Sequence, residues 1–156
     1  MHEISYDIIM NKQAIIIGIS GPSASGKSLL ANTIVNELGS EQVVVISEDA
    51  YYKDNGHLPF SEREKINYDH PDSFDHALLC EHLRQLRDGR PVEIPIYSHS
   101  KHMRLPETRT IGQHAIVILE GILLFSDKEL REIMDIRIFM STPLDVCLTR
   151  RLKRDV

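Results

Sequence analysis

Ala14-Ile15-Ile16-Ile17-Gly18-Ile19-Ser20-Gly21-Pro22-Ser23-Ala24-Ser25-Gly26-Lys27-Ser28 decides the fold of this 156-residue chain. The stretch opens with a continuous apolar run rich in β-branched side chains, which is typical of a strand buried on both faces of a parallel sheet. Its last eight residues match the pattern G-x-x-x-x-G-K-[ST] in full. The following residues, up to Leu38, carry apolar side chains at four-residue spacing and stop before Gly39, which predicts a helix.

This glycine loop has the mechanics of an anion site, known as a P-loop. Its glycines let the backbone N–H groups point inward, and the helix that begins near Lys27 directs its positive end to the same place. Lys27 would reach the β- and γ-phosphates of a nucleotide, and the Ser28 hydroxyl would bind Mg²⁺. A glycine-rich turn that only connects a strand to a helix is the alternative. The predicted nucleotide-binding residues of the loop are Gly21, Pro22, Ser23, Ala24, Ser25, Gly26, Lys27 and Ser28.

Three later stretches repeat the apolar run of the first strand, namely Val43–Ile46, Ala115–Leu119 and Ile136–Met140. A helical pattern over Asp75–Asp88 lies between them, and Thr142-Pro143 reads as the N-cap and first-turn proline of a last helix. Strands that alternate with helices form right-handed βαβ units. The sequence therefore predicts an α/β fold of the P-loop NTPase type, with three layers and a mostly parallel sheet.

Residues from about 91 to 111 interrupt this alternation. Val92–Tyr97 alternates and contains a proline, which suggests an edge strand or one arm of a hairpin, with Thr108–Ile111 as a return arm. The tip between them, Ser98–Arg104, is polar and basic. We expect a β-hairpin insertion here, and insertions on a rigid sheet often carry binding residues.

The length and composition indicate one globular domain over residues 1–156, and the glycine loop makes it a P-loop domain. The 18 Lys and Arg residues against 23 Asp and Glu residues give a net charge of −5, which disfavours a nucleic-acid partner. Cys80 and Cys147 follow no metal-ligand spacing, which favours a reducing compartment. The apolar runs are far shorter than the ~20 residues of a membrane span, and the polar start Met1–Glu3 is unlike a signal peptide. A cytoplasmic location without membrane contact is expected.

Carboxylates follow two of the predicted strands directly. Glu120 comes after Ala115–Leu119, and Asp49 comes shortly after Val43–Ile46. Ligands bind at the carboxyl ends of strands in open parallel sheets, so both acids should face the loop, and Glu120 would be the carboxylate ligand of Mg²⁺. The alternative is that they are solvated turn acids that cap the next helix. We favour that alternative only for Glu48, whose charge should also raise the pKa of Asp49.

Two further clusters favour an alcohol over water as the phosphate acceptor. Asp49–Tyr52 and Asn67–Asp72 each combine acidic and aromatic residues, and the second adds His70. Such groups can hold a polar ring and activate a hydroxyl. His70 could equally cap a turn, and Tyr51 suits packing better than ligand contact.

At this point the sequence resembles the uridine kinase (uridine/cytidine kinase) family. The resemblance extends from about Ile15 to Val156, essentially the whole chain, and rests on five blocks in order. These blocks are Gly21–Ser28, Ile46–Lys53, Asn67–Asp75, Ile94–Tyr97 and Leu119–Leu123. The stretch Ser98–Lys101 departs from the family pattern.

The resemblance implies transfer of the γ-phosphate of ATP, or of GTP, to the 5′-hydroxyl of uridine or cytidine, with Mg²⁺ as cofactor. Asp49 would be the general base, and Lys27 would act on the transferred phosphate. Asp69 would bind the ribose hydroxyls, His102 the base, and Arg154 the ATP phosphates. The implied substrate-binding residues are Asp49, Tyr52, Tyr68, Asp69, Tyr97, His102 and Arg151, and the implied metal ligands are Ser28 and Glu120.

The family also sets expectations beyond this site. Its members continue past the position of Val156 with an arginine-rich lid, a further strand and helices, so we expect this chain to be a fragment, and tetramers are common among them. Two other functions stay open. One is a related kinase of another small hydroxyl compound, phosphoribulokinase-like or pantothenate-kinase-like, and the other is a catalytically silent nucleotide-binding module.

Overall fold

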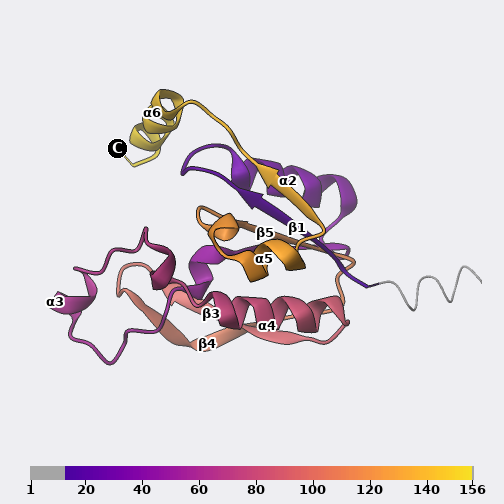
Figure 1. Cartoon of the computed structure of the whole chain (residues 1–156), viewed down its shortest axis with the longest axis horizontal. Helices are drawn as coiled ribbons and strands as arrows, with labels where there is room; N and C mark the ends of the chain where they lie inside the picture. The colour runs from indigo at the N-terminus through magenta and orange to yellow at the C-terminus, as the bar shows by residue number, and fades with distance from the viewer. Residues whose placement is uncertain (1–12, 156) are drawn as a thin grey trace, which may run out of the picture.

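The four apolar runs form one parallel sheet in the computed structural model, which describes residues 13–155 (Figure 1). The polar start Met1–Glu3 and Val156 lie outside these residues. The strands stand in the order β2-β5-β1-β6. Their bounds are β1 Ile15–Ser20, β2 Val43–Ser47, β5 Ile116–Gly121 and β6 Ile136–Phe139. The predicted parallel sheet is confirmed.

The strands are apolar throughout because successive side chains pack on opposite faces. On one face, Ile16, Val117 and Leu119 pack in the core that includes α4 (His76–Arg87) and α5 (Lys128–Ile133). On the other face, Ile19 and Ile118 pack against α2 (Lys27–Leu38). Burial of both faces removes the polar alternation that a half-exposed strand would show. The three-layer α/β architecture is therefore confirmed.

The predicted helix boundaries follow from local capping. The Asp75 carboxylate accepts a hydrogen bond of 3.1 Å from the backbone N–H of Leu78, which starts α4 at His76. This helix ends shortly before Gly89, whose φ of 77° places it in the left-handed region that glycine adopts at low cost. The short elements α3 (Phe60–Arg63), η1 (Glu48–Tyr51), η2 (Pro71–Ser73), η3 (Leu124–Ser126) and α5 were not predicted.

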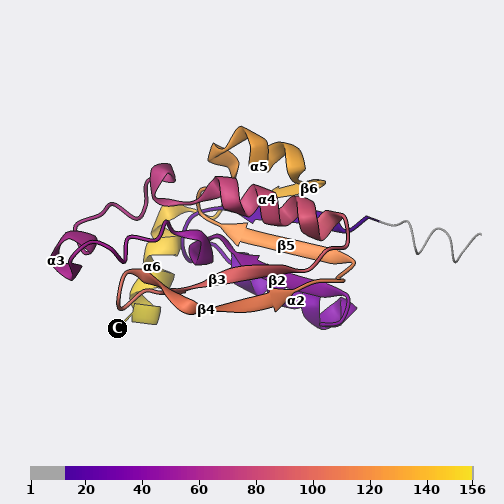
Figure 2. The same cartoon turned by 90° about the horizontal axis from the view of Figure 1, so that it is seen from below.

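The predicted hairpin is present as a separate antiparallel pair, β3 (Val92–Ser98) and β4 (Met103–Ile111), seen in Figure 2. The predicted return arm over Thr108–Ile111 is confirmed, although the arm is longer and starts at Met103. Most of β4 is exposed, so its side chains carry no apolar alternation that would mark a strand in the sequence. The arm β3 packs against η1, which brings the hairpin to the end of β2.

The last helix, α6 (Leu144–Asp155), begins after the predicted cap. The backbone N–H of Cys147 donates to the carbonyl of Pro143 over 3.1 Å, so Pro143 precedes the first turn instead of lying in it. The Thr142 hydroxyl donates to the carbonyl of Ser25 over 3.0 Å, and it therefore ties the start of α6 to the glycine loop. Among residues 13–155, no helix has the length and apolar character needed to cross a membrane.

Leu83 tests the core between α4 and the sheet. Its side chain is fully buried, so Leu83→Ala should lower the free energy of unfolding by about 2–5 kcal/mol in urea denaturation. Leu38→Ala is the control, because Leu38 is 51% exposed at the end of α2 and its loss should cost no more than about 0.5 kcal/mol. Equal losses in the two variants would contradict the assigned core.

Candidate active site

The carboxyl ends of the parallel strands meet around one cavity of about 600 Å³. Strand register places Glu120 of β5 opposite both Ser47 of β2 and Ile19 of β1. The glycine loop after β1 and the helix α6 complete the wall. The charged residues that line this cavity are Lys27, Asp49, Glu120, Arg150 and Arg154, and its other lining residues include Ser23, Ala24, Gly26, Ser28 and Ser47.

The loop geometry fits a bound phosphate. Gly26 has a φ of 100° directly before α2, a conformation that suits glycine. A Cβ on Gly21 would lie 2.7 Å from the carbonyl oxygen of Met140, so only glycine fits there. The Ser25 hydroxyl is buried and has no hydrogen-bond partner among residues 13–155. A buried hydroxyl normally has a partner, and a phosphate oxygen in the loop would supply one.

Lys27 occupies the first turn of α2 with its side chain largely buried. Its ammonium donates to the carbonyl of Pro22 over 2.8 Å, which folds the side chain along the loop. Burial lowers the pKa of Lys27, while the nearby carboxylates of Glu120 and Asp49 act in the opposite direction. The carboxylates of Glu120 and Asp49 therefore favour the charged ammonium form of Lys27.

The two strand-end acids lie close together, as predicted. The backbone N–H of Asp49 donates to the Ser47 hydroxyl over 3.3 Å, and the Ser47 side chain also lowers the pKa of Glu120. Burial raises the pKa of both carboxyls, and the charge of Asp49 further raises the pKa of Glu120. Glu120 and the Ser28 hydroxyl line the same cavity. Hard oxygen donors of this kind suit Mg²⁺, so the residues present fit that ion.

A second cavity of about 360 Å³ shares Ser47 and Asp49 with the first. The hairpin forms its opposite wall through residues that include Tyr97, His99 and Arg109. Asp49 therefore borders both the loop cavity and the hairpin cavity. His99 lowers the pKa of Asp49, whereas the charge of Glu48 raises it, as expected from the sequence.

The predicted aromatic residues form one cluster. The ring of Tyr52 lies 5.2 Å from Tyr68 and 5.0 Å from Tyr97, and the ring of His102 stacks on Tyr68 at 5.1 Å. Of these four residues, Tyr97 alone lines the hairpin cavity. Asp69 is exposed and lines neither cavity, although its charge is near enough to raise the pKa of Asp49.

Sequence reasoning missed Arg150, His99 and Arg109. Arg150 lines the loop cavity, and its guanidinium donates to the carbonyl of Ala24 over 3.5 Å, whereas Arg151 is exposed and lines neither cavity. The spacing of Arg150 and Arg154 by four residues could have identified them as one helix face. His99 lies in the turn that follows β3, close after Tyr97.

Glu48 is placed differently from the prediction of a solvated turn acid. Its side chain is fully buried and turned away from the loop cavity, which it does not line. Its carboxylate contacts His76 and the backbone N–H of Leu123. The readings of His70 and Tyr51 are confirmed, since His70 Nδ1 accepts from the backbone N–H of Asp72 and the buried Tyr51 pairs with His82 over 2.8 Å.

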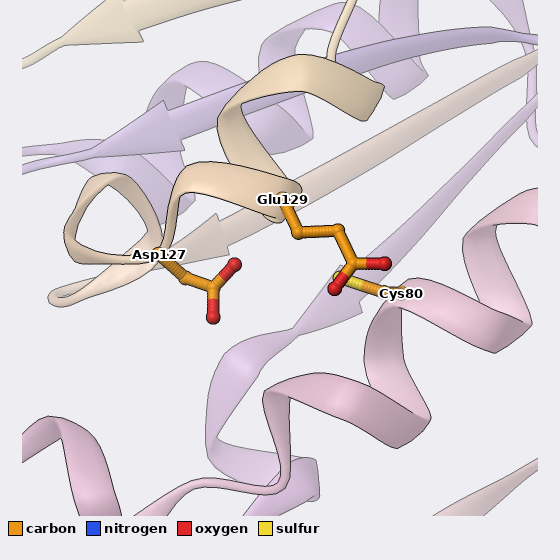
Figure 3. Close-up of side chains that lie close together, drawn as sticks. All are labelled: Cys80, Asp127 and Glu129. Carbon is orange, nitrogen blue, oxygen red and sulfur yellow. The ribbon is translucent and has the colours of Figure 1, made fainter.

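A second group of potential metal ligands, Cys80, Asp127 and Glu129, lies between α4 and α5 (Figure 3). Each member has another role or is unsuited to binding. Glu129 pairs with Arg84, and the Asp127 carboxylate accepts from the backbone N–H of Leu130 to cap α5. Burial raises the pKa of the Cys80 thiol to about 12, so the thiolate that metals require is disfavoured. The donor set near the loop is the better metal site.

A glycine loop between a buried strand and a helix, with strand-end carboxylates beside it, defines a P-loop protein of the kinase type. A protein described as "a Possible Uridine Kinase from Bacillus stearothermophilus" has the same fold, with a TM-score of 0.64 and 22% identity. The match covers 98% of this chain and 86% of that one.

The sequence comparisons identify the family. The model of the phosphoribulokinase / uridine kinase family matches residues 16–156, and the chain belongs to this family. The uridine kinase of Tolumonas auensis is 58% identical over 150 residues, which cover 94% of this chain and 70% of that protein. The uridine kinase of Vibrio cholerae is 55% identical with the same coverage.

The charge of Glu120 should cost stability in the absence of ligands. Since burial raises its pKa in the folded state, the stabilising protonated form is populated at low pH and is lost as the pH rises through that pKa. Glu120→Gln should therefore raise the midpoint of thermal unfolding near pH 7, by roughly 2–4 °C for each kcal/mol gained. The gain should disappear below about pH 4. Glu107→Gln, at an exposed position, should show no gain at either pH.

Proposed function

We propose that this chain is a nucleoside kinase that transfers the γ-phosphate of ATP to the 5′-hydroxyl of uridine or cytidine. The observation that carries this proposal is the position of Asp49, which borders the loop cavity on one side and the hairpin cavity on the other. A phosphate donor and an alcohol acceptor could thus meet at one carboxylate. The uridine kinases that share more than half of its residues support the choice of nucleoside.

In this mechanism Asp49 acts as the general base. Its carboxylate accepts the proton of the 5′-hydroxyl while the hydroxyl oxygen forms a bond to the γ-phosphorus. The bond from that phosphorus to the bridging oxygen breaks, and ADP leaves with the electron pair. The raised pKa of Asp49 makes it a better proton acceptor than an exposed aspartate, provided that it is ionised.

The negative charge of the donor would be balanced by cations that line the loop cavity. Lys27, Arg150 and Arg154 stand around the loop and would bind the phosphate oxygens. Ser28 and Glu120 would hold Mg²⁺, which when bound neutralises charge on the β- and γ-phosphates. The carboxylates that raise the pKa of Lys27 also keep its ammonium charged until the nucleotide binds.

The nucleoside would bind against the hairpin. Tyr97 lines the cavity beside Asp49, and we assign the neighbouring rings of Tyr52, Tyr68 and His102 to the pocket for the base. Asp69 and Arg151, both exposed, are assigned to the ribose and to the sugar end of the substrate. A carboxylate suits a ribose diol, because it accepts hydrogen bonds from both hydroxyls.

Asp49→Asn tests the base. The amide cannot accept the proton. The kcat for uridine in a coupled ADP assay should therefore fall by roughly 10²-fold or more, which is the scale that a general base contributes. Binding of ATP by the glycine loop should change little, as calorimetry would show. Asp88→Asn, at the exposed end of α4, is the matched control and should keep full activity. Near-normal turnover of Asp49→Asn would refute the assigned base.

His99 should set the acid limit of the activity. A protonated His99 lowers the pKa of Asp49, so His99→Asn should raise that pKa and move the acid limb of kcat/KM to higher pH. The loss relative to the unchanged enzyme should be larger at pH 6 than at pH 8. Lys101→Asn, on the exposed tip of the same hairpin, should leave the limb in place at moderate salt. An unchanged limb in His99→Asn would contradict the coupling.

A further inference from the structure

The carboxylate of Glu48 is buried with both oxygens occupied. Oε2 lies 2.8 Å from Nε2 of His76, and Oε1 accepts a hydrogen bond of 2.9 Å from the backbone N–H of Leu123. Glu48 is fully buried and His76 is 7% exposed. A buried charge is costly unless it is paired and hydrogen bonded, and here both conditions are met by groups far apart in the sequence.

These two contacts join the segments that carry the active-site acids. Glu48 directly precedes Asp49 in η1, and Leu123 follows Glu120 by three residues after the end of β5. The approach is close, since a Cβ on Gly121 would lie 2.5 Å from the Glu48 side chain. The position of Asp49 relative to Glu120 therefore depends on where the Glu48 carboxylate is held.

His76 is itself fixed from two sides. The ring of Phe74 stacks on it with centroids 5.4 Å apart and an interplanar angle of 6°. Its Nδ1 lies 3.8 Å from the Asp127 carboxylate, which caps α5. The imidazole thus stands between two carboxylates, and it extends the contact of Glu48 to the beginnings of α4 and α5.

We propose that Glu48 and His76 form a positioning pair that holds the general base and the metal-binding carboxylate at their working separation. The proposal rests on the function assigned above. Glu48 lines neither the loop cavity nor the hairpin cavity, so it acts through its neighbours and not on substrate. With both oxygens bound, its side chain cannot rotate without breaking a contact, and η1 is thereby pinned to the end of β5.

Glu48→Leu removes both contacts while it keeps the site filled. We expect kcat to fall by roughly 30- to 100-fold, the scale expected when reacting groups shift by about 1 Å, with KM for uridine changed no more than about threefold. Glu48→Gln retains an oxygen for the Leu123 N–H and an amide for His76, so it should restore most of kcat. His76→Leu removes one of the two contacts, so its kcat should lie between those of Glu48→Leu and Glu48→Gln. This variant carries the test if Glu48→Leu does not fold.

A second readout does not depend on any acceptor. Calorimetry of ATP binding with and without Mg²⁺ measures how much the ion strengthens binding, and this gain should be largely lost in Glu48→Leu because Glu120 is displaced. Binding of ATP alone should be unchanged. If the unaltered chain phosphorylates neither uridine nor cytidine, the proposed function fails, while this measurement still decides on the positioning pair.

Asp135→Leu is the control for a general loss of stability. Asp135 also accepts from a strand N–H, that of Ile16 at 2.8 Å, and pairs with Arg87, but it does so at the opposite end of the sheet. This variant should unfold at lower temperature while keeping kcat and the Mg²⁺ gain. Unchanged kcat and Mg²⁺ gain in folded Glu48→Leu, or equal losses in Asp135→Leu, would overturn the proposal.

Discussion

The hydrogen-bonded register of β5 between β1 and β2 is the constraint on which the site depends. It sets Glu120 opposite Ser47 on one side and Ile19 on the other, and it brings the glycine loop, η1 and the turn after β5 to one edge of the sheet. A shift of one residue would turn each side chain to the opposite face, so the two cores would no longer pack and Glu120 would leave the site. Packing of both faces therefore specifies the register, and the register assembles the site.

The assembled site concentrates negative charge away from water. Burial raises the pKa of Asp49 and Glu120, and the charge of Asp49 raises that of Glu120 further, so these carboxyls carry a cost that the fold must offset. Lys27 offers a partial balance, and the arginines of α6 add positive charge at the cavity wall. A nucleotide with its metal would complete this balance, because the ion pairs with the acids and the phosphates pair with the cations. The stability of the protein and its ligand binding are linked through these groups.

The hairpin adds the second half of the site. The hairpin of β3 and β4 is inserted in the chain between α4 and β5. Because β3 packs against η1, the hairpin lies beside the end of β2. The hairpin cavity therefore lies between the parallel sheet and the hairpin, whose two strands pair with each other and not with that sheet. The rings of Tyr52, Tyr68 and Tyr97 contact one another beside the hairpin, so a nucleoside bound there would lie among these rings.

Local patterns were enough to determine the strands, the main helices, the glycine loop and the acids at the strand ends, since each depends on residues adjacent in the chain. The direction in which each acid points was decided only by tertiary contacts. Glu48 and Asp49 are neighbours, yet one turns inward to partners 28 and 75 residues away and the other faces the cavities. His99 and Arg150 reach the site for the same reason. Such pairings depend on the packing of distant segments, which no short window of sequence contains.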